Sequence, residues 1–431
     1  MYLNCSGYSV SAQDFVRCLM QKSYPVYVEK NQHRDNFNFA GLSPYMLHMF
    51  HQMEYEKDIS QTLSVWNFPP SQFETTGKIN IGYTDYEVTK LPELWVKNCN
   101  KMDEIWTSSA FCKRVFLNSG VKRDIKVIPH TIDSSLWNPN VEAVDIPNKR
   151  GFTFLFVSEW MPRKGIYELL RAWYRAFKHR DDVCLILKTY LGSHRNIDAI
   201  RREIVQVRQE FNLTHDKTAP ILYCPDFIED SLMPNFFQCA DVLVAPSLGE
   251  GFGLSVVQAE MMGIPVIATN WSSLVEVCNN DIGYMIDIKG LEPVSQKQID
   301  FIPSYKDAQW AKLDEDNLID IMRHVYNNPD ELATKSKKCI DFAQQFGYQQ
   351  VSNKLIRNIN RVLSRNKLKD TVNIIFDKET GKIGEQYKDT VVLGRSEAQK
   401  ITLDSFVNYF PGAKFVKVYI NNSEYLWGKI P

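Results

Sequence analysis

The first third of the chain alternates short apolar runs with stretches of helical periodicity. Phe15, Cys18 and Leu19 recur at helical spacing after a glycine turn at residues 7–9, which predicts a helix that follows a very short first strand at 1–5. β-type runs bounded by turn residues predict strands at 24–28, 79–83, 104–107 and 126–128. Alternation of this kind is typical of an α/β domain.

A second α/β pattern follows a segment rich in Pro and Asn at 137–150, which we interpret as a linker. Residues 152–157 are almost continuously apolar, as in a buried parallel strand, and a helix at 166–177 and a strand at 183–187 complete a βαβ unit. A second open sheet is therefore predicted. Its further elements are strands at 221–224, 241–245 and 265–269, a mostly polar helix at 196–211, and a late helix at 350–363.

The last segment, residues 371–431, returns to β-type runs at 372–376 and 415–420. Its charges nearly balance, so they indicate no electrostatic purpose. We interpret it as a small appended α+β module with no assignable role.

Length and composition narrow the classes of protein that these patterns allow. A chain of 431 residues and 50.0 kDa suggests two or three domains, and 44% hydrophobic residues exclude disorder or coiled coil for the whole. The 50 Lys and Arg residues against 51 Asp and Glu residues leave a net charge of −1. No global field therefore favours nucleic acid or an anionic membrane, and any basic site must be local.

The nine cysteines are scattered singly, without a C-x-x-C pair, which argues against a disulfide framework or a zinc ribbon. No stretch approaches 18 continuous apolar residues, and the N-terminus lacks a charged region followed by an apolar run. We therefore expect no membrane span and a reducing, cytoplasmic location.

Residues 246–269, with the sequence PSLGEGFGLSVVQAEMMGIPVIAT, hold the most informative pattern. A predicted strand ends at Ala245, a loop with three glycines and one carboxylate follows, and a helix begins near Leu254. Backbone N–H groups and a helix N-terminus then lie at the carboxyl edge of the sheet, where doubly wound folds bind ligands. The pattern favours an anion such as a diphosphate. A glycine-rich turn without a ligand is the simpler alternative for a lone G-x-G.

This segment closely resembles the signature of the retaining family-four glycosyltransferases, which have the GT-B fold. Glu250, Gly251, Phe252 and Gly253 match its E-G-F-G loop. The resemblance implies that Glu250 contacts hydroxyls of the donor sugar and that the loop, through to Leu254, reaches the diphosphate and sugar. The family's second Glu, which holds the nucleotide ribose, is replaced here by Gln258. An amide still hydrogen-bonds hydroxyls but supplies no charge.

A second match covers residues 154–165, FLFVSEWMPRKG. In the family, an Arg just after the strand and a Lys before the Gly neutralise the donor diphosphate, whose charge grows in the transition state. Lys164 takes the Lys position, whereas Ser158 or Glu159 stands where the family has the Arg. Arg163 is either a substitute for that Arg or part of a solvated helix start. The resemblance thus implies Glu250, Lys164 and Arg163 as the catalytic residues.

The N-terminal half resembles the acceptor-side domain of one subgroup of the family. The matching segments are residues 80–92 (NIGYTDYEVTKLP), 102–109 and 127–133 (VIPHTID). We expect Gly7 to help bind the donor and Tyr8 and Glu87 to face the cleft between the domains. His130 is either a second cleft residue or a hinge histidine that caps a turn.

Together the matches span about residues 1–365, and they imply an α/β protein of the GT-B fold with two Rossmann-like domains facing a cleft. The predicted parts are an acceptor-side domain at 1–145, a nucleotide-sugar-binding domain at 146–345, a helix at 346–366 that crosses back to the first domain, and the appended module at 371–431.

The activity implied is transfer of a sugar from a nucleotide diphosphate sugar to an acceptor hydroxyl with retention of anomeric configuration. We expect no cofactor and no metal, because no D-x-D in a suitable context is present. Two alternatives stay open: a catalytically silent or binding-only relative, which Gln258 and Glu159 favour, and another sugar-phosphate enzyme on the same fold. The sequence specifies neither the donor sugar, nor the acceptor, nor the oligomeric state.

Overall fold

The computed structural model describes residues 15, 18, 26–30, 63–190, 197–226, 228–366, 372–376, 415–420 and 423–428. The chain divides into two compact units, each described by itself. One comprises Met1–Phe68, Glu74–Ile81 and Ile359–Pro431, and the other comprises Pro69–Phe73 and Gly82–Asn358. The domain bounds expected from the sequence stay a prediction.

A six-stranded sheet forms the centre of the second unit, with the strand order β11-β10-β9-β6-β7-β8. All of its strand pairs are parallel, and residues 153–156 of β6 are buried, as the continuous apolar run predicted. The strands are β6 (Phe152–Glu159), β7 (Val183–Tyr190), β8 (Ile221–Cys224), β9 (Val242–Ala245), β10 (Val266–Thr269) and β11 (Tyr284–Ile286).

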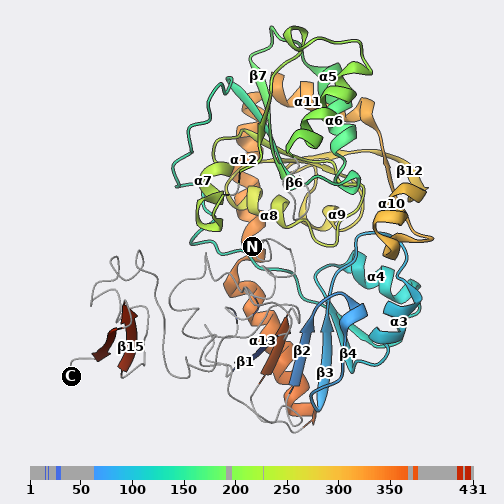
Figure 1. Ribbon diagram of the computed structural model, residues 1–431, viewed down its shortest axis with the longest axis vertical. Helices are drawn as coiled ribbons and strands as arrows, with labels where there is room; N and C mark the ends of the chain where they lie inside the picture. The colour runs from blue at the N-terminus through green and yellow to red at the C-terminus, as the bar shows by residue number, and fades with distance from the viewer. Residues whose placement is uncertain are drawn as a thin grey trace. The chain divides into compact units, whose positions relative to one another are not determined.

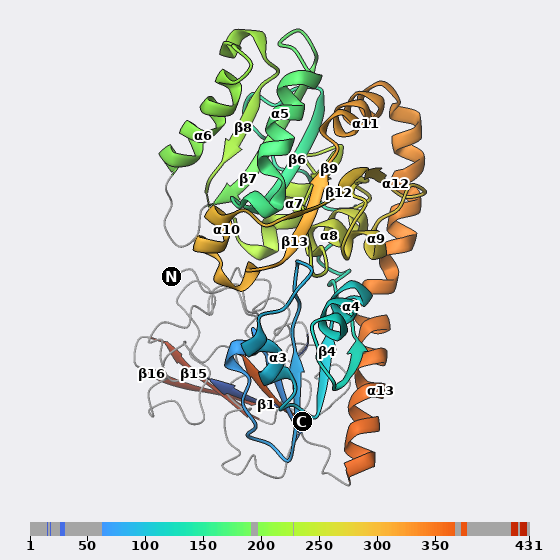
Figure 2. The ribbon, with the colours of Figure 1, turned by 90° about the vertical axis from the view of Figure 1, so that its right-hand side faces the viewer.

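Helices cover both faces of this sheet (Figure 1). Right-handed crossovers place α5 (Ile166–Ala176) and α6 (Ile197–Gln209) on one face. The same rule places α7 (Met233–Phe237), α8 (Leu254–Met261) and α9 (Leu274–Val277) on the other. α11 (Glu315–Asn327) packs against α5, and α12 (Pro329–Ala343) packs against α8 (Figure 2). The arrangement is that of a doubly wound fold.

The order of the strands reverses between β6 and β9. From β6 the chain proceeds outward to β7 and β8, and from β9 it proceeds in the opposite direction to β10 and β11. The loops after β6 and β9 therefore leave on either side of the topological switch point, at the carboxyl edge of the sheet. Open α/β sheets bind ligands at this position.

An antiparallel hairpin interrupts the alternation between β11 and α11. Its strands are β12 (Ile288–Pro293) and β13 (Gln309–Leu313), and α10 (Gln296–Phe301) and the 3-10 helix η6 (Pro303–Tyr305) lie between them. Strand β12 is largely exposed, and its short, mixed pattern gave no strand prediction. We call residues 288–313 the β12–β13 hairpin.

The other six-stranded sheet has the order β1-β14-β2-β3-β4-β5. Its strands are β1 (Val26–Lys30), β2 (Leu63–Asn67), β3 (Ile79–Tyr83), β4 (Glu104–Thr107), β5 (Asp124–Val127) and β14 (Val372–Phe376), and β3 contributes residues to both units. β14 pairs in parallel with both β1 and β2. Its residues were expected to open an appended module, and they are instead an inner strand, because the local pattern specifies a strand but not its partners.

The remaining elements complete the description. They are α3 (Glu93–Cys99), α4 (Ala110–Asn118), α13 (Tyr348–Asn366), the antiparallel pair β15 (Phe415–Ile420) and β16 (Ser423–Gly428), and the 3-10 helices η2 (Pro70–Gln72), η3 (Pro162–Lys164), η4 (His215–Lys217), η5 (Asp230–Leu232) and η7 (Gln344–Phe346).

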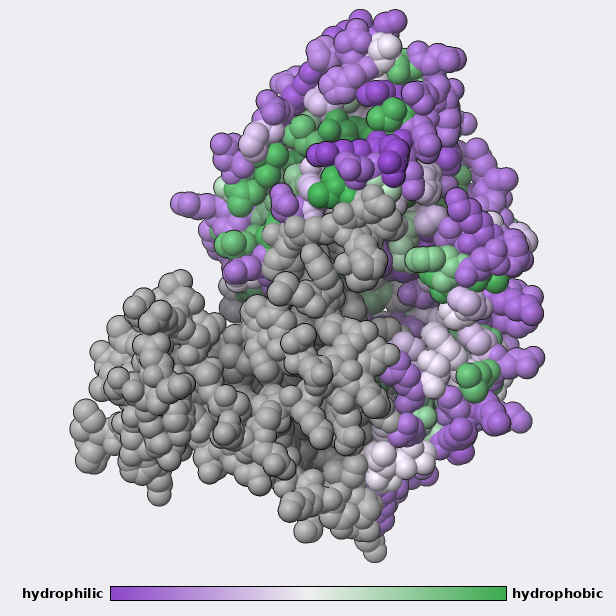
Figure 3. All heavy atoms as spheres, viewed as in Figure 1, coloured by the Kyte–Doolittle hydropathy of each residue, from purple (hydrophilic) through white to green (hydrophobic). Residues whose placement is uncertain are grey.

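The described surface seen in Figure 3 is mostly hydrophilic, with hydrophobic residues in small groups. None of the helices among the described residues combines the length and the apolarity needed to traverse a bilayer.

Candidate active site

The loop after β6 is held against the loop after β9 by its backbone. Gly165, the N-cap residue of α5, has a φ of 70°, in the left-handed region that favours glycine. A Cβ atom at Gly165 would lie 1.9 Å from the Pro246 carbonyl oxygen. The N–H of Leu248 also donates to the Arg163 carbonyl oxygen at 2.7 Å. These backbone contacts place Arg163 and Lys164 beside the E-G-F-G loop.

Four charged side chains meet there, and we call Arg163, Lys164, Glu250 and Glu87 the ion cluster. Lys164 Nζ lies 2.5 Å from Glu250 Oε1, and Arg163 Nη1 lies 3.4 Å from Glu250 Oε2. Arg163 Nη2 lies 3.5 Å from Glu87 Oε1. Arg163 is 8% exposed and Glu250 13%, so water screens these pairs weakly.

The carboxylate and the two cations change one another's ionisation. Burial raises the pKa of Glu250, but Lys164 and Arg163 outweigh burial and lower the pKa to about 2. Burial lowers the pKa of Lys164, and Arg163 lowers it further, whereas Glu250 opposes both. Glu250 is therefore ionised at neutral pH.

Serine hydroxyls fix the backbone around Glu250. Its N–H donates to Ser272 Oγ at 3.1 Å, and its carbonyl oxygen accepts from Ser273 Oγ at 2.9 Å. The Gly251 carbonyl oxygen accepts from Ser109 Oγ at 2.7 Å. Because peptides are planar and trans, the N–H groups of Gly251 and Phe252 point opposite to these carbonyls. Among the described residues, neither N–H has a protein acceptor.

The glycines of the loop permit close packing against the segment after β3. A Cβ atom at Gly249 would lie 2.1 Å from the Glu87 carbonyl oxygen, and one at Gly251 would lie 2.8 Å from Asp85 Cβ. Any larger residue at either position would push the two segments apart. This packing requires the glycines whether or not a phosphate approaches the loop.

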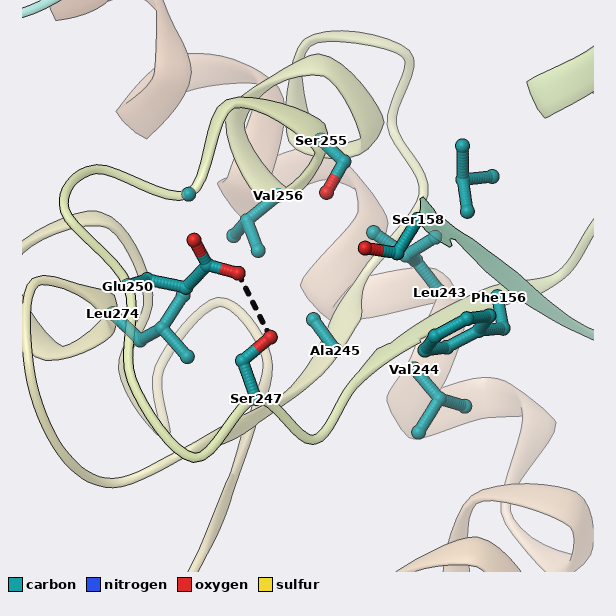
Figure 4. A pocket seen from close by; sticks show the side chains of 12 residues that line it. Phe156, Ser158, Leu243, Val244, Ala245, Ser247, Glu250, Ser255, Val256 and Leu274 are labelled. Atoms are coloured by element: carbon teal, nitrogen blue, oxygen red, sulfur yellow. Dashed lines mark hydrogen bonds between the residues drawn. The ribbon is translucent and has the colours of Figure 1, made fainter. Parts of the chain in front are cut away.

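A small pocket lies beside Glu250 at the switch point. Ser247 Oγ donates to Glu250 Oε1 at 2.8 Å, and Figure 4 shows the oxygen atoms of Ser158, Ser247, Glu250 and Ser255 pointing toward the space between them. Ser158, one of the two residues at the position of the family Arg, thus contributes a neutral hydroxyl. The remaining lining is mainly apolar and includes Leu243, Val256 and Leu274.

Phe252, the aromatic residue of the E-G-F-G loop, packs into the core and does not line the pocket. Phe252 is 5% exposed and packs edge-on against His130 and Phe346, with ring centroids 5.1 and 5.6 Å apart, so it belongs to the core.

Of the other predicted donor-binding residues, Gly253 lines the pocket, and Leu254 begins α8. Gln258 is half-buried one helical turn beyond Leu254 and Ser255 and is not among the residues that line the pocket. Gly7 and Tyr8 lie outside the described residues.

His130 belongs to a hydrogen-bonded chain with Tyr83 and Asp85. Its Nε2 lies 2.7 Å from Asp85 Oδ2, and its Nδ1 lies 3.1 Å from the Tyr83 hydroxyl. Asp85 Oδ1 accepts from the Ser108 N–H at 2.8 Å. Burial raises the pKa of Asp85, but His130 and Ser108 lower it to about 2. Both ring nitrogens of His130 are engaged within the protein, which favours the structural interpretation.

Sequence reasoning grouped Lys164, Arg163 and Glu250 and expected Glu87 only to face the cleft between the domains, and it missed several supports of these residues. Asp85 follows the end of β3 by two residues, so its position at a strand end was an available signal. Ser272 follows the end of β10 by three residues and so carried the same signal, whereas Tyr305 lies in a segment whose local pattern carries none. The assignment of catalytic and donor-binding roles stays a prediction.

Part of the chain is similar in sequence to known glycosyltransferases. Residues 151–294 match the family model for glycosyl transferases group 1. The chain is 28% identical over 160 residues to O-antigen chain mannosyltransferase B of Escherichia coli, which covers 37% of this chain and 38% of that protein. It is 24% identical over 239 residues to D-inositol 3-phosphate glycosyltransferase of Paenarthrobacter aurescens (strain TC1), which covers 53% of this chain and 49% of that protein. The chain thus spans about half or less of these curated relatives.

Two solved structures share the fold. Sucrose-phosphate synthase from Thermosynechococcus elongatus superposes with a TM-score of 0.61 at 16% identity, over 84% of this chain and 94% of that chain. Anabaena Alr3699/HepE, in complex with UDP and glucose, superposes with a TM-score of 0.54 at 14% identity, over 83% of this chain and 96% of that chain. The predicted GT-B fold is confirmed. Residues 151–294 of this chain are thus similar to the glycosyl transferases group 1 family, and the chain shares the GT-B fold of these two structures.

Proposed function

We propose that this protein transfers a hexose from a nucleotide diphosphate sugar to an acceptor hydroxyl, with retention of anomeric configuration. The observation that carries the proposal is the ion cluster at the switch point, where two cations and a carboxylate from the loops after β6 and β9 meet. A site for a donor needs cations for the diphosphate and an acceptor of hydrogen bonds for the sugar hydroxyls. The cluster offers both.

Lys164 is the cation that meets the leaving diphosphate in this proposal. In the structure its ammonium contacts Glu250, which is also the residue proposed to contact the donor sugar. A bound diphosphate competes with Glu250 for the ammonium, so donor binding exchanges one partner of Lys164 for another. Because charge grows on the diphosphate as the glycosidic bond breaks, this contact is stronger in the transition state than in the ground state.

Arg163 acts differently, because its guanidinium is already tied to the protein. Nη1 donates to the Gly249 carbonyl oxygen at 2.6 Å and faces Glu250, and Nη2 faces Glu87. Moving it to a ligand breaks several buried contacts. We propose that it stays in place, fixes the loop and adds positive potential to the donor site.

The stereochemical part of the proposal rests on the resemblance, in which the leaving phosphate and the acceptor share one face of the sugar. UDP-glucose is a suitable first donor, because the Alr3699/HepE structure contains UDP and glucose. GDP-mannose is the second, because the chain is similar to a mannosyltransferase.

The proposal is tested by turnover of these two donors in the wild type, in Lys164→Ala and in Lys337→Ala, which removes an exposed lysine of α12. Loss of one preorganised electrostatic partner is expected to lower kcat on the order of a hundredfold. Lys337→Ala should match the wild type, and circular dichroism should show all three proteins folded. Retention is read from the anomeric configuration of the product by NMR. Near wild-type kcat in Lys164→Ala would remove the main charge from the mechanism.

A binding-only relative is the second candidate, and Gln258 in place of the family Glu favours it. The two candidate functions predict different results for the Gln258→Glu variant. Calorimetry measures its affinity for UDP, and a kinetic assay measures its turnover of the donors. A carboxylate makes stronger hydrogen bonds to ribose hydroxyls, so an active transferase should keep its turnover and bind UDP more tightly. Tight UDP binding without turnover of either donor, in both proteins, would support the binding-only relative.

A further inference from the structure

The β12–β13 hairpin joins two segments of the site. The N–H of Ala311 in β13 donates to the Leu248 carbonyl oxygen at 2.8 Å, beside the E-G-F-G loop. The N–H of Gln309 donates to Thr89 Oγ1 at 2.8 Å, and the N–H of Thr89 returns a hydrogen bond to the Gln309 carbonyl oxygen at 3.2 Å. Strand β13 therefore fixes the loop after β9 and the segment after β3 to one another.

Tyr305 is the residue of the hairpin that reaches the ion cluster. Its side chain is 4% exposed, and its hydroxyl donates to Glu87 Oε2 at 3.4 Å. The ring packs edge-on against Tyr86, with centroids 6.1 Å apart, and the Tyr86 hydroxyl donates to the Ser304 carbonyl oxygen. Tyr305 is thus anchored on the backbone side as well as at its hydroxyl.

The Tyr305 hydroxyl is linked to Arg163 through Glu87: it donates to Glu87 Oε2, and Glu87 Oε1 lies 3.5 Å from Arg163 Nη2. Burial lowers the pKa of the Arg163 guanidinium, but Tyr305, Glu87 and Glu250 outweigh burial and raise it. A phenol hydroxyl that donates to Glu87 fixes the position of that carboxylate, and with it a partner of the guanidinium. Glu87 is therefore the carboxylate that Tyr305 and Arg163 share.

Arg163 depends on such partners to keep one orientation. Its contacts to Gly249, Glu250 and Glu87 occupy the two terminal nitrogens, and its buried Nε has no hydrogen-bond partner among the described residues. A buried guanidinium that loses a partner turns toward another acceptor, because an unpaired buried donor is costly. Glu250, already 3.4 Å from Nη1, is an acceptor toward which the guanidinium can turn, and Lys164 also requires the position of Glu250.

We infer that Tyr305 is a positioning residue for sugar transfer, which holds Arg163 and Glu87 in place so that Lys164 and Glu250 keep the geometry that the donor needs. The inference rests on the proposed function. It adds a residue from the β12–β13 hairpin, outside both motif loops, to the machinery of the site.

The test compares Tyr305→Phe with Tyr174→Phe. Tyr174 is a matched control on α5: it is 2% exposed, and its hydroxyl donates to the Ile204 carbonyl oxygen at 3.2 Å. Each change removes one buried hydroxyl and keeps the ring. Crystal structures of both variants and the wild type, without ligand, report the Arg163 side chain, and kinetics with UDP-glucose and GDP-mannose report its consequence.

In Tyr305→Phe we expect the Arg163 guanidinium to leave its position at the Gly249 carbonyl oxygen. We expect kcat to fall on the order of tenfold, because a displacement of about 1 Å can cost up to a hundredfold. The KM for the donor should change less than about twofold, since Tyr305 is not expected to touch it. Tyr174→Phe should keep the wild-type position of Arg163 and the wild-type kcat.

A double-mutant cycle separates positioning from a general loss of stability. In an Arg163→Lys background, Tyr305→Phe should change kcat less than about twofold, because its partner is already gone, whereas independent effects would multiply. An unmoved Arg163 in Tyr305→Phe overturns the inference, as does the same fall in kcat in both backgrounds. If the wild type turns over neither donor, the proposed function fails, and the crystal structures alone decide whether Tyr305 positions Arg163.

Discussion

Glu250 lies between two cations and is largely buried, and this placement ties the stability of the protein to pH. Its pKa is about 2 in the folded protein and near 4.5 when unfolded. A lowered folded pKa stabilises the protein above the unfolded pKa, and this contribution is lost as the pH falls towards the folded pKa.

We therefore expect the free energy of unfolding of the wild type to exceed that of Glu250→Gln by on the order of 3 kcal/mol at pH 7. The difference should shrink as the pH falls from about 5 towards about 2. Urea unfolding across this range measures it, with Glu210→Gln, an exposed position just beyond α6, as the control. A difference that is independent of pH would contradict the ion cluster.

At this scale the sequence could predict Lys164 and Glu250 as neighbours, because each follows an apolar run that ends at the carboxyl edge of one sheet. Tyr305 could not be predicted. It belongs to a 3-10 turn inside an insertion, and its approach to Glu87 depends on how β13 pairs with Thr89. Contacts between segments far apart in the sequence leave no periodic pattern.

Among the elements, the junction between β6 and α5 determines where Lys164 lies. Gly165 combines a φ of 70° with the close approach of the Pro246 carbonyl oxygen, so a side chain there has both backbone strain and a steric clash. Gly290 of β12 has a φ of 110° but no atom within 4 Å of the place where a Cβ would lie. Substitutions at Gly165 and at Gly290 therefore separate the cost of the steric clash from the cost of backbone strain.

Gly290→Ala should lower the free energy of unfolding by roughly 1–2 kcal/mol, the cost of a left-handed backbone for a residue with a side chain. Gly165→Ala should lower it by several kcal/mol, since the two loops must also separate, and it should lower donor turnover through Lys164. Urea unfolding and donor kinetics measure both. Equal losses of stability in the two variants would show that the contact with Pro246 yields easily.

The strands of the second sheet were predictable because their apolar runs are short, continuous and bounded by turn residues; β8 has the predicted bounds, and β9 and β10 differ by one residue. The β12–β13 hairpin was missed, because its first strand is largely exposed and lacks alternation. The spacing of apolar residues in a sequence reflects which positions are buried, so a strand that buries few side chains leaves little pattern from which to predict it.

For the whole molecule, the pairing of β14 makes the first sheet depend on residues 372–376. Sequence patterns predicted this strand with the correct bounds, but strand order is a property of the assembled sheet. β15 and β16 pair only with each other in the described part of the chain. The C-terminal segment therefore contains one strand that the sheet requires and a pair that it does not.

Two truncations test this difference. Removal of residues 367–431 deletes β14 and leaves β1 and β2 with unpaired backbone groups, so we expect aggregation or loss of cooperative unfolding. Removal of residues 415–431 deletes only the β15–β16 pair, and we expect the remaining protein to stay monodisperse. Size-exclusion chromatography and thermal unfolding distinguish them. A well-folded 1–366 protein would show that β1 and β2 do not need β14.

The same strand imposes an order on biosynthesis. Residues 372–376 leave the ribosome about 300 residues after β2, which at about 5–20 residues per second is a delay of roughly 15–60 s. The whole second unit, through Asn358, emerges within that interval and can fold first. Until residues 372–376 emerge, β1 and β2 lack the strand that pairs with both of them. The sheet that contains the N-terminal strands β1 and β2 is therefore completed only after the second unit has been synthesised.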